Sequence, residues 1–138
     1  MGVLIDSSVL IEWERKKFDL ASVVEPRQSE SFFISVVTVS ELLHGVGRAR
    51  RPEVRMRRSA FVERIIAEFP ALEVDLAIAR LHGEISATLS AQGLFIPAQD
   101  LWIGCTALYH GLSVWTCNLR DFARIPGLVV EKIPADKE

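Results

Sequence analysis

Four acidic residues stand where the chain passes from strand-like into helix-like segments, and together they could hold a metal ion for catalysis. They are Asp6, Glu41, Asp100 and Asp121. In a parallel α/β sheet the carboxyl ends of the strands lie at one edge, and ligands bind there. Carboxylates that gather at such an edge repel one another unless a hard cation such as Mg²⁺ or Mn²⁺ neutralises them. The sequence therefore predicts an acidic divalent-metal site, provided that the fold brings the four residues together.

Strand-like and helix-like segments alternate along the chain, which predicts an α/β fold with a mainly parallel sheet of about five strands in three layers. The pattern predicts strands at about 2–6, 32–34, 71–74, 112–117 and 128–130. It predicts helices at about 8–16, 19–25, 38–49, 52–68, 76–91 and 98–110. The unbroken apolar run of the first strand is typical of a strand that is buried on both faces.

Capping residues mark several of the expected helix ends. Ser7 and Ser8 are expected to cap the first helix, and Asp75 is expected to cap the fifth. Gly111 is expected to end the sixth helix, because glycine adopts the left-handed conformation that commonly closes a helix.

Each acid also has a simpler interpretation that involves no catalysis. Asp6 and Asp100 could stabilise helix starts through the helix dipole. Glu41 could lie on a solvated helix surface, and Asp121 could belong to a turn. The order and spacing of the four acids favour a shared site, because four independent coincidences would otherwise be needed.

The composition is that of an ordinary soluble globular protein. Of 138 residues, 49% are apolar and 25% are charged, so residues 1–138 are expected to form one domain. The formal net charge of −2 gives no overall attraction to nucleic acid. Cys105 and Cys117 form no CxxC pair, which favours reduced thiols. We see no signal peptide and no membrane-spanning stretch, so we expect a cytoplasmic protein.

The segments around the four acids resemble the motifs of PIN-domain nucleases of the VapC toxin family. The resemblance rests on Asp6-Ser7-Ser8-Val9-Leu10-Ile11, on residues 35–46 with Glu41, on residues 100–107 with Asp100, and on residues 116–122 with Asp121. It extends over nearly the whole chain in the order of the family. The chain departs from the family's usual residues at Trp102, Gly104-Cys105 and Cys117, and these departures remove no carboxylate.

The resemblance implies a three-layer α/β/α PIN-like fold and an endoribonuclease activity that depends on Mg²⁺ or Mn²⁺. It further implies that the chain is the toxin of a type II toxin–antitoxin system. RNA would then be the substrate, a VapB-like antitoxin the partner, and a homodimer the oligomeric state. The chemistry agrees, because a metal held by carboxylates can activate a water for in-line attack on a phosphodiester and stabilise charge on the leaving oxygen.

The expected roles of the residues follow from this resemblance and from metal chemistry. Asp6 and Asp100 are the expected principal metal ligands, and Asp121 completes the site directly or through water. Glu41 is expected to orient or deprotonate the attacking water. Hydrogen bonds that fix the carboxylates are expected from Ser7, Thr116 and Asn118.

Rival interpretations fit the residues less well. A haloacid-dehalogenase-type phosphatase needs a second aspartate where Ser8 stands, and a response-regulator receiver needs an acid pair and a late lysine in a pattern that is missing. A flap-type deoxyribonuclease needs insertions for which 138 residues leave little room. A PIN-like module that acts mainly in a toxin–antitoxin regulatory complex on DNA stays open, although the four retained acids favour catalysis.

Seven of the twelve arginines lie between positions 48 and 64. Arginine donates paired hydrogen bonds to phosphate, so this cluster could guide RNA toward acids that by themselves repel phosphate. A solvated helix face would explain the same residues. The antitoxin could dock on apolar residues that ordinary core packing would also explain, namely Val9, Leu10, Trp13, Phe18 and the helix at 52–69.

Overall fold

The computed structural model describes residues 2–134, and five parallel strands form its central sheet. The strands are β1 (Gly2–Ile5), β2 (Ser31–Ser35), β3 (Ala71–Leu72), β4 (Ser113–Thr116) and β5 (Val130–Lys132). Their order across the sheet is β3-β2-β1-β4-β5, and every neighbouring pair runs parallel. The predicted parallel sheet of about five strands is therefore confirmed, and β3 and β5 form its edges.

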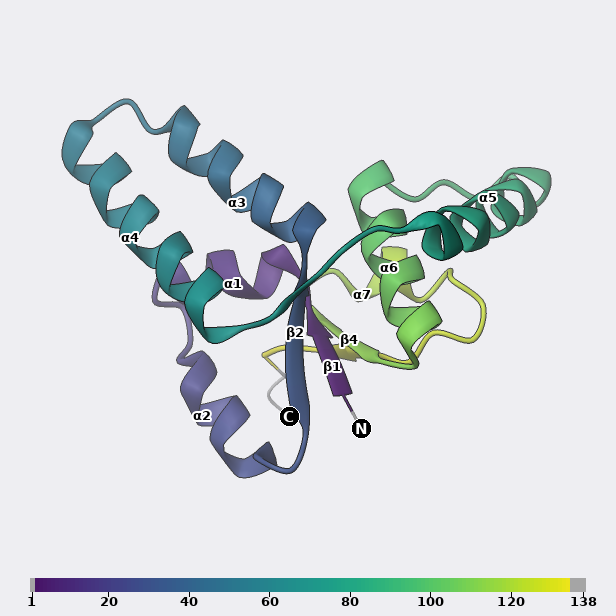
Figure 1. Ribbon diagram of the computed structural model, residues 1–138, viewed down its shortest axis with the longest axis horizontal. Helices are drawn as coiled ribbons and strands as arrows, with labels where there is room; N and C mark the ends of the chain where they lie inside the picture. Colours follow the sequence, from purple (N-terminus) through teal and green to yellow (C-terminus); the bar gives the residue numbers. More distant parts are fainter. Residues whose placement is uncertain (1, 135–138) are drawn as a thin grey trace.

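Helices cover both faces of this sheet and complete the three predicted layers (Figure 1). One face carries α1 (Ser7–Glu14), α2 (Leu20–Val24), α3 (Val36–Arg48) and α4 (Pro52–Glu68), and the other carries α5 (Leu76–Ala91), α6 (Ala98–His110) and α7 (Leu119–Phe122). Val3 and Ile5 of β1 pack into the first core and Leu4 packs into the second. Burial on both faces explains the apolar run of β1. Across residues 2–134, no helix combines the length and the apolarity needed to cross a membrane.

The helix ends confirm two capping predictions and correct one. The Asp75 carboxylate accepts a backbone N–H of the first turn of α5, and Gly111 ends α6 with a left-handed φ of 67°. The prediction for α1 was wrong, because Asp6 rather than Ser7 or Ser8 precedes its first turn and makes no side-chain capping bond. Instead, the Ser8 hydroxyl donates to the Asp6 carboxylate, which is a stronger acceptor because it is charged.

Two local elements differ from the sequence pattern. Asp121 lies in the short helix α7, which was not predicted because four residues are too few to show a helical period. β3 has only two residues, so the predicted strand at 71–74 was too long. The remaining elements lie within a few residues of the predicted ranges, as is usual for element boundaries.

The apolar residues of α1 belong to the core. Val9 and Leu10 are 0% exposed, so core packing accounts for them and the suggestion that they dock an antitoxin was wrong. Trp13 meets the ring of Phe61 on α4 edge-on, with 5.6 Å between the ring centroids. Aromatic pairs of this geometry add to the stability of packed helices, so this contact holds α4 against α1.

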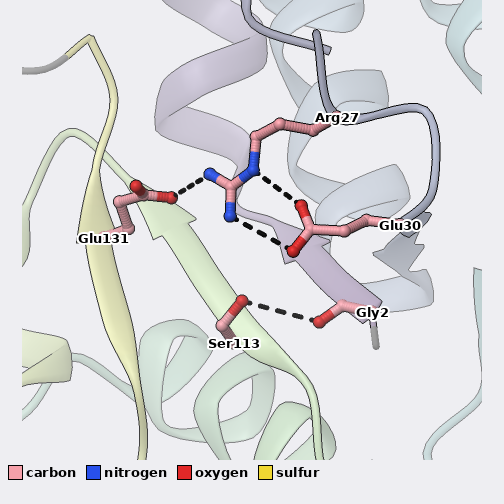
Figure 2. A network of polar contacts seen from close by, with 5 residues as sticks. All are labelled: Gly2, Arg27, Glu30, Ser113 and Glu131. Carbon is pink, nitrogen blue, oxygen red and sulfur yellow. Dashed lines mark hydrogen bonds and ion pairs between the residues drawn. The ribbon is translucent and has the colours of Figure 1, made fainter. Parts of the chain in front are cut away.

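Arg27 ties the segment before β2 to the far edge of the sheet (Figure 2). It ends a short 3₁₀ turn (Glu25–Arg27) and pairs with Glu30 at 2.7 Å and with Glu131 of β5 at 2.6 Å. Its guanidinium also lies 5.1 Å from the centroid of the buried Trp115 ring. Paired hydrogen bonds to carboxylates and stacking on an aromatic face both favour arginine over lysine. The network therefore braces β4 and β5, and β4 leads into the acidic edge of the sheet.

The start of α3 should depend on Ser35, whose buried hydroxyl accepts the backbone N–H of Val37 at 3.0 Å. We expect Ser35→Ala to lower the free energy of unfolding by about 1 kcal/mol, the usual cost of a lost helix cap. Urea unfolding measures this change, and Ser90→Ala on the exposed surface of α5 serves as the control. Equal stability of Ser35→Ala and the unsubstituted protein would contradict the capping role.

Candidate active site

Asp6 is the most buried of the four acids, and its side chain is held in one orientation. Its backbone N–H continues the β1–β4 ladder by donating to the carbonyl of Trp115 at 2.9 Å. One carboxylate oxygen, Oδ2, accepts the hydroxyls of Ser8 at 2.7 Å and Thr116 at 2.9 Å. The other oxygen, Oδ1, is buried and has no hydrogen-bond partner. An unpaired buried carboxylate oxygen is costly unless a cation or a donor meets it.

The two hydroxyls that hold Asp6 are themselves fixed by the backbone after β4. The Cys117 N–H donates to Ser8 Oγ at 3.0 Å, and the Asn118 N–H donates to Thr116 Oγ1 at 2.9 Å. Each hydroxyl has one hydrogen to give. The two hydroxyl oxygens also lie 3.2 Å apart, but the charged Asp6 carboxylate is the stronger acceptor, so both hydrogens are directed to Asp6. The arrangement therefore locks the Asp6 carboxylate with one oxygen saturated and one available.

Glu41 projects from α3 and is linked to the start of α1. The Ser7 hydroxyl donates to Glu41 Oε1 at 3.2 Å. The pKa of Glu41 is raised above its ordinary value, first because the carboxyl is partly buried and second because the Asp6 charge lies nearby. The Ser7 hydrogen bond opposes this shift because it favours the ionised form. Glu41 is therefore a stronger base than an exposed glutamate.

The pKa of Asp100 is affected by the charges of all three other acids. It lies in the first turn of α6, and its pKa is raised to about 7, chiefly by burial and then by the charges of Asp6, Glu41 and Asp121. The helix dipole favours a negative charge in a first turn, so burial and repulsion outweigh it here. The fold thus brings the four acids predicted from the sequence into electrostatic contact at the carboxyl edge of the sheet.

The acids converge without forming a closed metal cage. Among the residues that the structure describes, no group of three or more His, Cys, Asp and Glu side chains is arranged to hold a metal ion. Electrostatic coupling reaches farther than direct ligation, so this finding is compatible with the raised pKa of Asp100. Mg²⁺ usually keeps several waters and takes only one or two carboxylates directly. An open set of oxygens with one buried and unpaired, Asp6 Oδ1, fits such a hydrated cation.

The residues expected to orient the carboxylates behave in three different ways. Thr116 donates to Asp6, and Ser7 donates to Glu41 rather than to an aspartate. Asn118 contributes its backbone N–H, whereas its side chain is exposed. Ser8 was missed because it was interpreted as a helix cap. A hydroxyl two residues after a buried aspartate was the signal available, since such a side chain can turn back to the carboxylate.

The fold and the site define a parallel α/β domain in which the charges of Asp6, Glu41 and Asp121 act on Asp100. The model of the family described as "PIN domain" matches residues 3–128. Ribonuclease VapC1 of Rickettsia felis is 34% identical over 130 residues, which cover 94% of this chain and 95% of that protein. The chain therefore belongs to the PIN-domain family and, within it, to the VapC proteins.

One protein sequence and one solved structure from Salmonella typhimurium are also similar to this chain. One is the tRNA(fMet)-specific endonuclease VapC, which is 38% identical over 98 residues, or 71% of this chain and 72% of that protein. The other is a chain of the crystal structure of DNA-bound VapBC, with a TM-score of 0.85 and 31% identity. That superposition covers 96% of this chain and 98% of the Salmonella chain. The likeness extends over the sheet and both helical layers.

The metal-free protein should lose stability as the pH rises toward neutrality. Because the folded pKa of Asp100, about 7, lies above its ordinary value of 3.8, the folded state binds more protons than the unfolded state between these values. The free energy of unfolding therefore falls as the pH rises through this range, and the loss is complete above it. We expect Asp100→Asn to reduce this dependence and to stabilise the metal-free protein at pH 8.

Urea unfolding in EDTA at pH 5 and pH 8 measures the effect. Glu84→Gln, on the exposed surface of α5, is the control and should keep the pH dependence of the unsubstituted protein. A pH dependence that is unchanged in Asp100→Asn would contradict the repulsion among the four carboxylates.

Proposed function

We propose that this chain is the toxin of a type II toxin–antitoxin system and acts as an endoribonuclease that hydrolyses phosphodiester bonds of RNA. The observation that carries the proposal is the convergence of Asp6, Glu41, Asp100 and Asp121 at one edge of the sheet, reflected in the raised pKa of Asp100. Membership of the VapC proteins supports the choice of RNA, because the similar proteins of Rickettsia felis and Salmonella typhimurium are named as a ribonuclease and a tRNA endonuclease.

The proposed cofactor is Mg²⁺, with Mn²⁺ as an alternative. Asp6 and Asp100 would hold the ion and Asp121 would complete the site, in keeping with the preference of these ions for oxygen ligands. A divalent ion at this place supplies positive charge that stabilises the attacking and leaving oxygens of a phosphodiester. The unpaired Oδ1 of Asp6 supports this assignment because a cation would satisfy it.

Glu41 is the proposed base. Its raised pKa makes it a better proton acceptor than an exposed glutamate once it is ionised. The Ser7 hydroxyl orients one oxygen of the Glu41 carboxylate, Oε1, through a hydrogen bond of 3.2 Å. The second oxygen can then accept a proton from a water that lies between Glu41 and the phosphorus atom. Ser8 and Thr116 keep the Asp6 carboxylate in place during this step.

The proposed partner is a VapB-like antitoxin. VapBC complexes are among the solved structures that resemble this chain, including the DNA-bound complex of Salmonella typhimurium. Homodimerisation remains a prediction from the family resemblance, and a cytoplasmic location remains a prediction from the sequence, which shows no signal peptide and no membrane-spanning stretch. The two free cysteines, Cys105 and Cys117, agree with a reducing compartment.

Asp6→Asn and Asp100→Asn should each abolish RNA cleavage while leaving the chain folded. We expect a loss larger than the roughly 10- to 100-fold drop typical of residues that only orient metal ligands. Cleavage of cellular RNA in Mg²⁺, with mapping of new 5′ ends after brief expression, measures the loss and identifies the cleaved bond. EDTA should stop the reaction, and Mn²⁺ should restore it.

Asp75→Asn is the matched control, because it changes an aspartate that caps α5 and is not among the charges that act on Asp100. Full cleavage by either active-site variant would contradict the assigned roles. If the unsubstituted protein cleaves no RNA yet forms a complex with its partner on DNA, the chain is instead a regulatory binding module.

Ser8→Ala should weaken activity through the orientation of Asp6. The change removes one of the two hydroxyls on Oδ2 and leaves the Cys117 N–H without its acceptor. We expect activity and apparent metal affinity to fall by roughly 10- to 100-fold. Titration with Mg²⁺ at fixed RNA concentration separates the two effects, and Ser8→Thr should retain part of the activity because it keeps the hydroxyl. Equal metal dependence of Ser8→Ala and the unsubstituted protein would argue against this role.

A further inference from the structure

Gly104 lies in the interior of α6, four residues after Asp100 and therefore one helical turn farther along the same side of the helix. A helix interior favours alanine over glycine, so Gly104 makes α6 less stable than alanine would. Gly104 is also buried. Because glycine has no side chain, it allows another part of the protein to approach the helix backbone closely. The position of Gly104 therefore indicates a close contact between α6 and a neighbouring segment.

Ile125 is the residue that makes this contact. A Cβ atom on Gly104 would overlap Ile125 Cδ1. The same Cβ would lie 3.5 Å from Leu128 Cδ2 and 3.6 Å from Phe122 Cδ1, which are ordinary contact distances. Ile125 is 2% exposed and packs in the same core as Phe122, so its methyl group has little room to move aside. Ile125 Cδ1 therefore fills the space that a side chain at residue 104 would need.

This contact lies close to two of the four acids. Ile125 follows Asp121 by four residues, just as Gly104 follows Asp100. Asp121 belongs to α7, and the chain continues to turn beyond it, because the N–H groups of residues 124 and 125 donate to the carbonyls three residues earlier at 3.3 and 3.1 Å. The packing of Ile125 on Gly104 is therefore about one turn of the chain away from each of these two carboxylates.

A hydrogen bond joins the same two segments at a second point. The Arg124 guanidinium donates from Nη1 to the carbonyl of Phe95, which lies in the loop that leads into α6. Phe95 precedes Asp100 in the sequence, and Gly104 follows it. The segment that carries Asp121 is therefore attached to α6 and to the loop before it, at points on both sides of Asp100.

The spacing of Asp100 and Asp121 matters for the binding of a cation. Burial is the main cause of the raised pKa of Asp100, and the charges of Asp6 and Glu41 add to it. The charge of Asp121 contributes as well, so the two carboxylates interact. Mg²⁺ requires nearly ideal octahedral geometry, with ligands at about 2.0–2.1 Å. A shift of one carboxylate relative to the other would therefore weaken its binding.

We infer that Gly104 is a positioning residue: it lets Ile125 pack directly on the backbone of α6, and this contact sets the position of Asp121 relative to Asp100 for binding a divalent cation. The inference rests on the proposed metal-dependent function and adds a residue that acts through its packing. A methyl group at residue 104 would push the α7 segment away from α6, because a close-packed core passes such a displacement on to the backbone.

The first measurement is the binding of Mn²⁺ to the metal-free protein without RNA, by isothermal titration calorimetry. Gly104→Ala should bind Mn²⁺ on the order of tenfold more weakly, as is typical when the orientation of a metal ligand is disturbed. Ile125→Val removes Cδ1, the atom that the new methyl group would overlap. Gly104→Ala combined with Ile125→Val should therefore recover most of the affinity, with Ile125→Val alone as the reference.

Gly83→Ala is the matched control for Gly104→Ala. Gly83 lies in the interior of α5, and a Cβ there would meet no atom within 4 Å. Gly83→Ala should leave Mn²⁺ binding unchanged. Thermal unfolding of each variant in EDTA separates positioning from stability. If Gly104 contributed only to stability, Gly104→Ala would change the unfolding temperature and leave the Mn²⁺ affinity of the folded protein as it was.

Arg124→Gln tests the same contact without changing the core, because it removes the hydrogen bond to Phe95. We expect Arg124→Gln to weaken Mn²⁺ binding. Loss of a positive charge by itself would favour a cation, so the expected change is opposite to the effect of charge alone. Arg120→Gln removes the same charge from an exposed position of α7 and should not weaken binding.

The outcomes separate this inference from the proposed function. The inference is overturned, and the ribonuclease function stands, if the unsubstituted protein cleaves RNA and Gly104→Ala binds Mn²⁺ as Gly83→Ala does. It is also overturned if Ile125→Val fails to restore the affinity of Gly104→Ala. If Gly104→Ala does not fold, unchanged or tighter Mn²⁺ binding by Arg124→Gln overturns it.

Two further results concern the unsubstituted protein. If it binds Mn²⁺ and the variants show the expected changes, but it cleaves no RNA, the inference stands and the proposed ribonuclease function fails. If it binds no Mn²⁺, the proposed cofactor and this inference are both overturned.

Discussion

Repulsion among four carboxylates is the constraint on which the rest of this structure depends. Burying an unpaired negative charge is costly, and this site contains several negative charges at close range. The structure meets the cost in two ways. It saturates one oxygen of Asp6 with the hydroxyls of Ser8 and Thr116, and it lets Asp100 hold its proton until about pH 7. The repulsion among the carboxylates therefore favours the binding of either a proton or a cation.

The scaffold fixes the positions of the four acids despite their mutual repulsion. β1 lies in the middle of the sheet and is buried on both faces, so Asp6 at its end has little freedom to move. Glu41 and Asp100 stand on helices from opposite layers, and Asp121 stands on the short α7. Arg27 pairs with Glu30 and Glu131 (Figure 2) and lies over the Trp115 ring, so it braces β4 and β5. Residues outside the catalytic site thus keep the four acids near one another against their electrostatic repulsion.

Much of the fold followed from local patterns, whereas the details of the site did not. The apolar run before Asp6 and the strand–helix alternation predicted the parallel sheet, because burial on both faces leaves a clear mark on a strand. The role of Ser8 could not be predicted, since its choice between the helix backbone and the Asp6 carboxylate depends on the backbone after β4, more than 100 residues away. α7 was too short to show a helical period in the sequence. A hollow that Glu41 lines depends on how α1, α3 and α4 pack together.

The hydrogen bonds that hold Asp6 come from residues far along the sequence, and this has a consequence for the synthesis of the protein. Asp6 is made before β4, and Thr116 and the backbone of Cys117, which complete its surroundings, follow 110 or more residues later. A nascent chain that has not yet released β4 from the ribosome lacks both. Asp6 then has no fixed orientation, and the pairing of β1 with β4 is missing as well. The Asp6 carboxylate therefore gains its fixed orientation only after β4 has been made and has paired with β1.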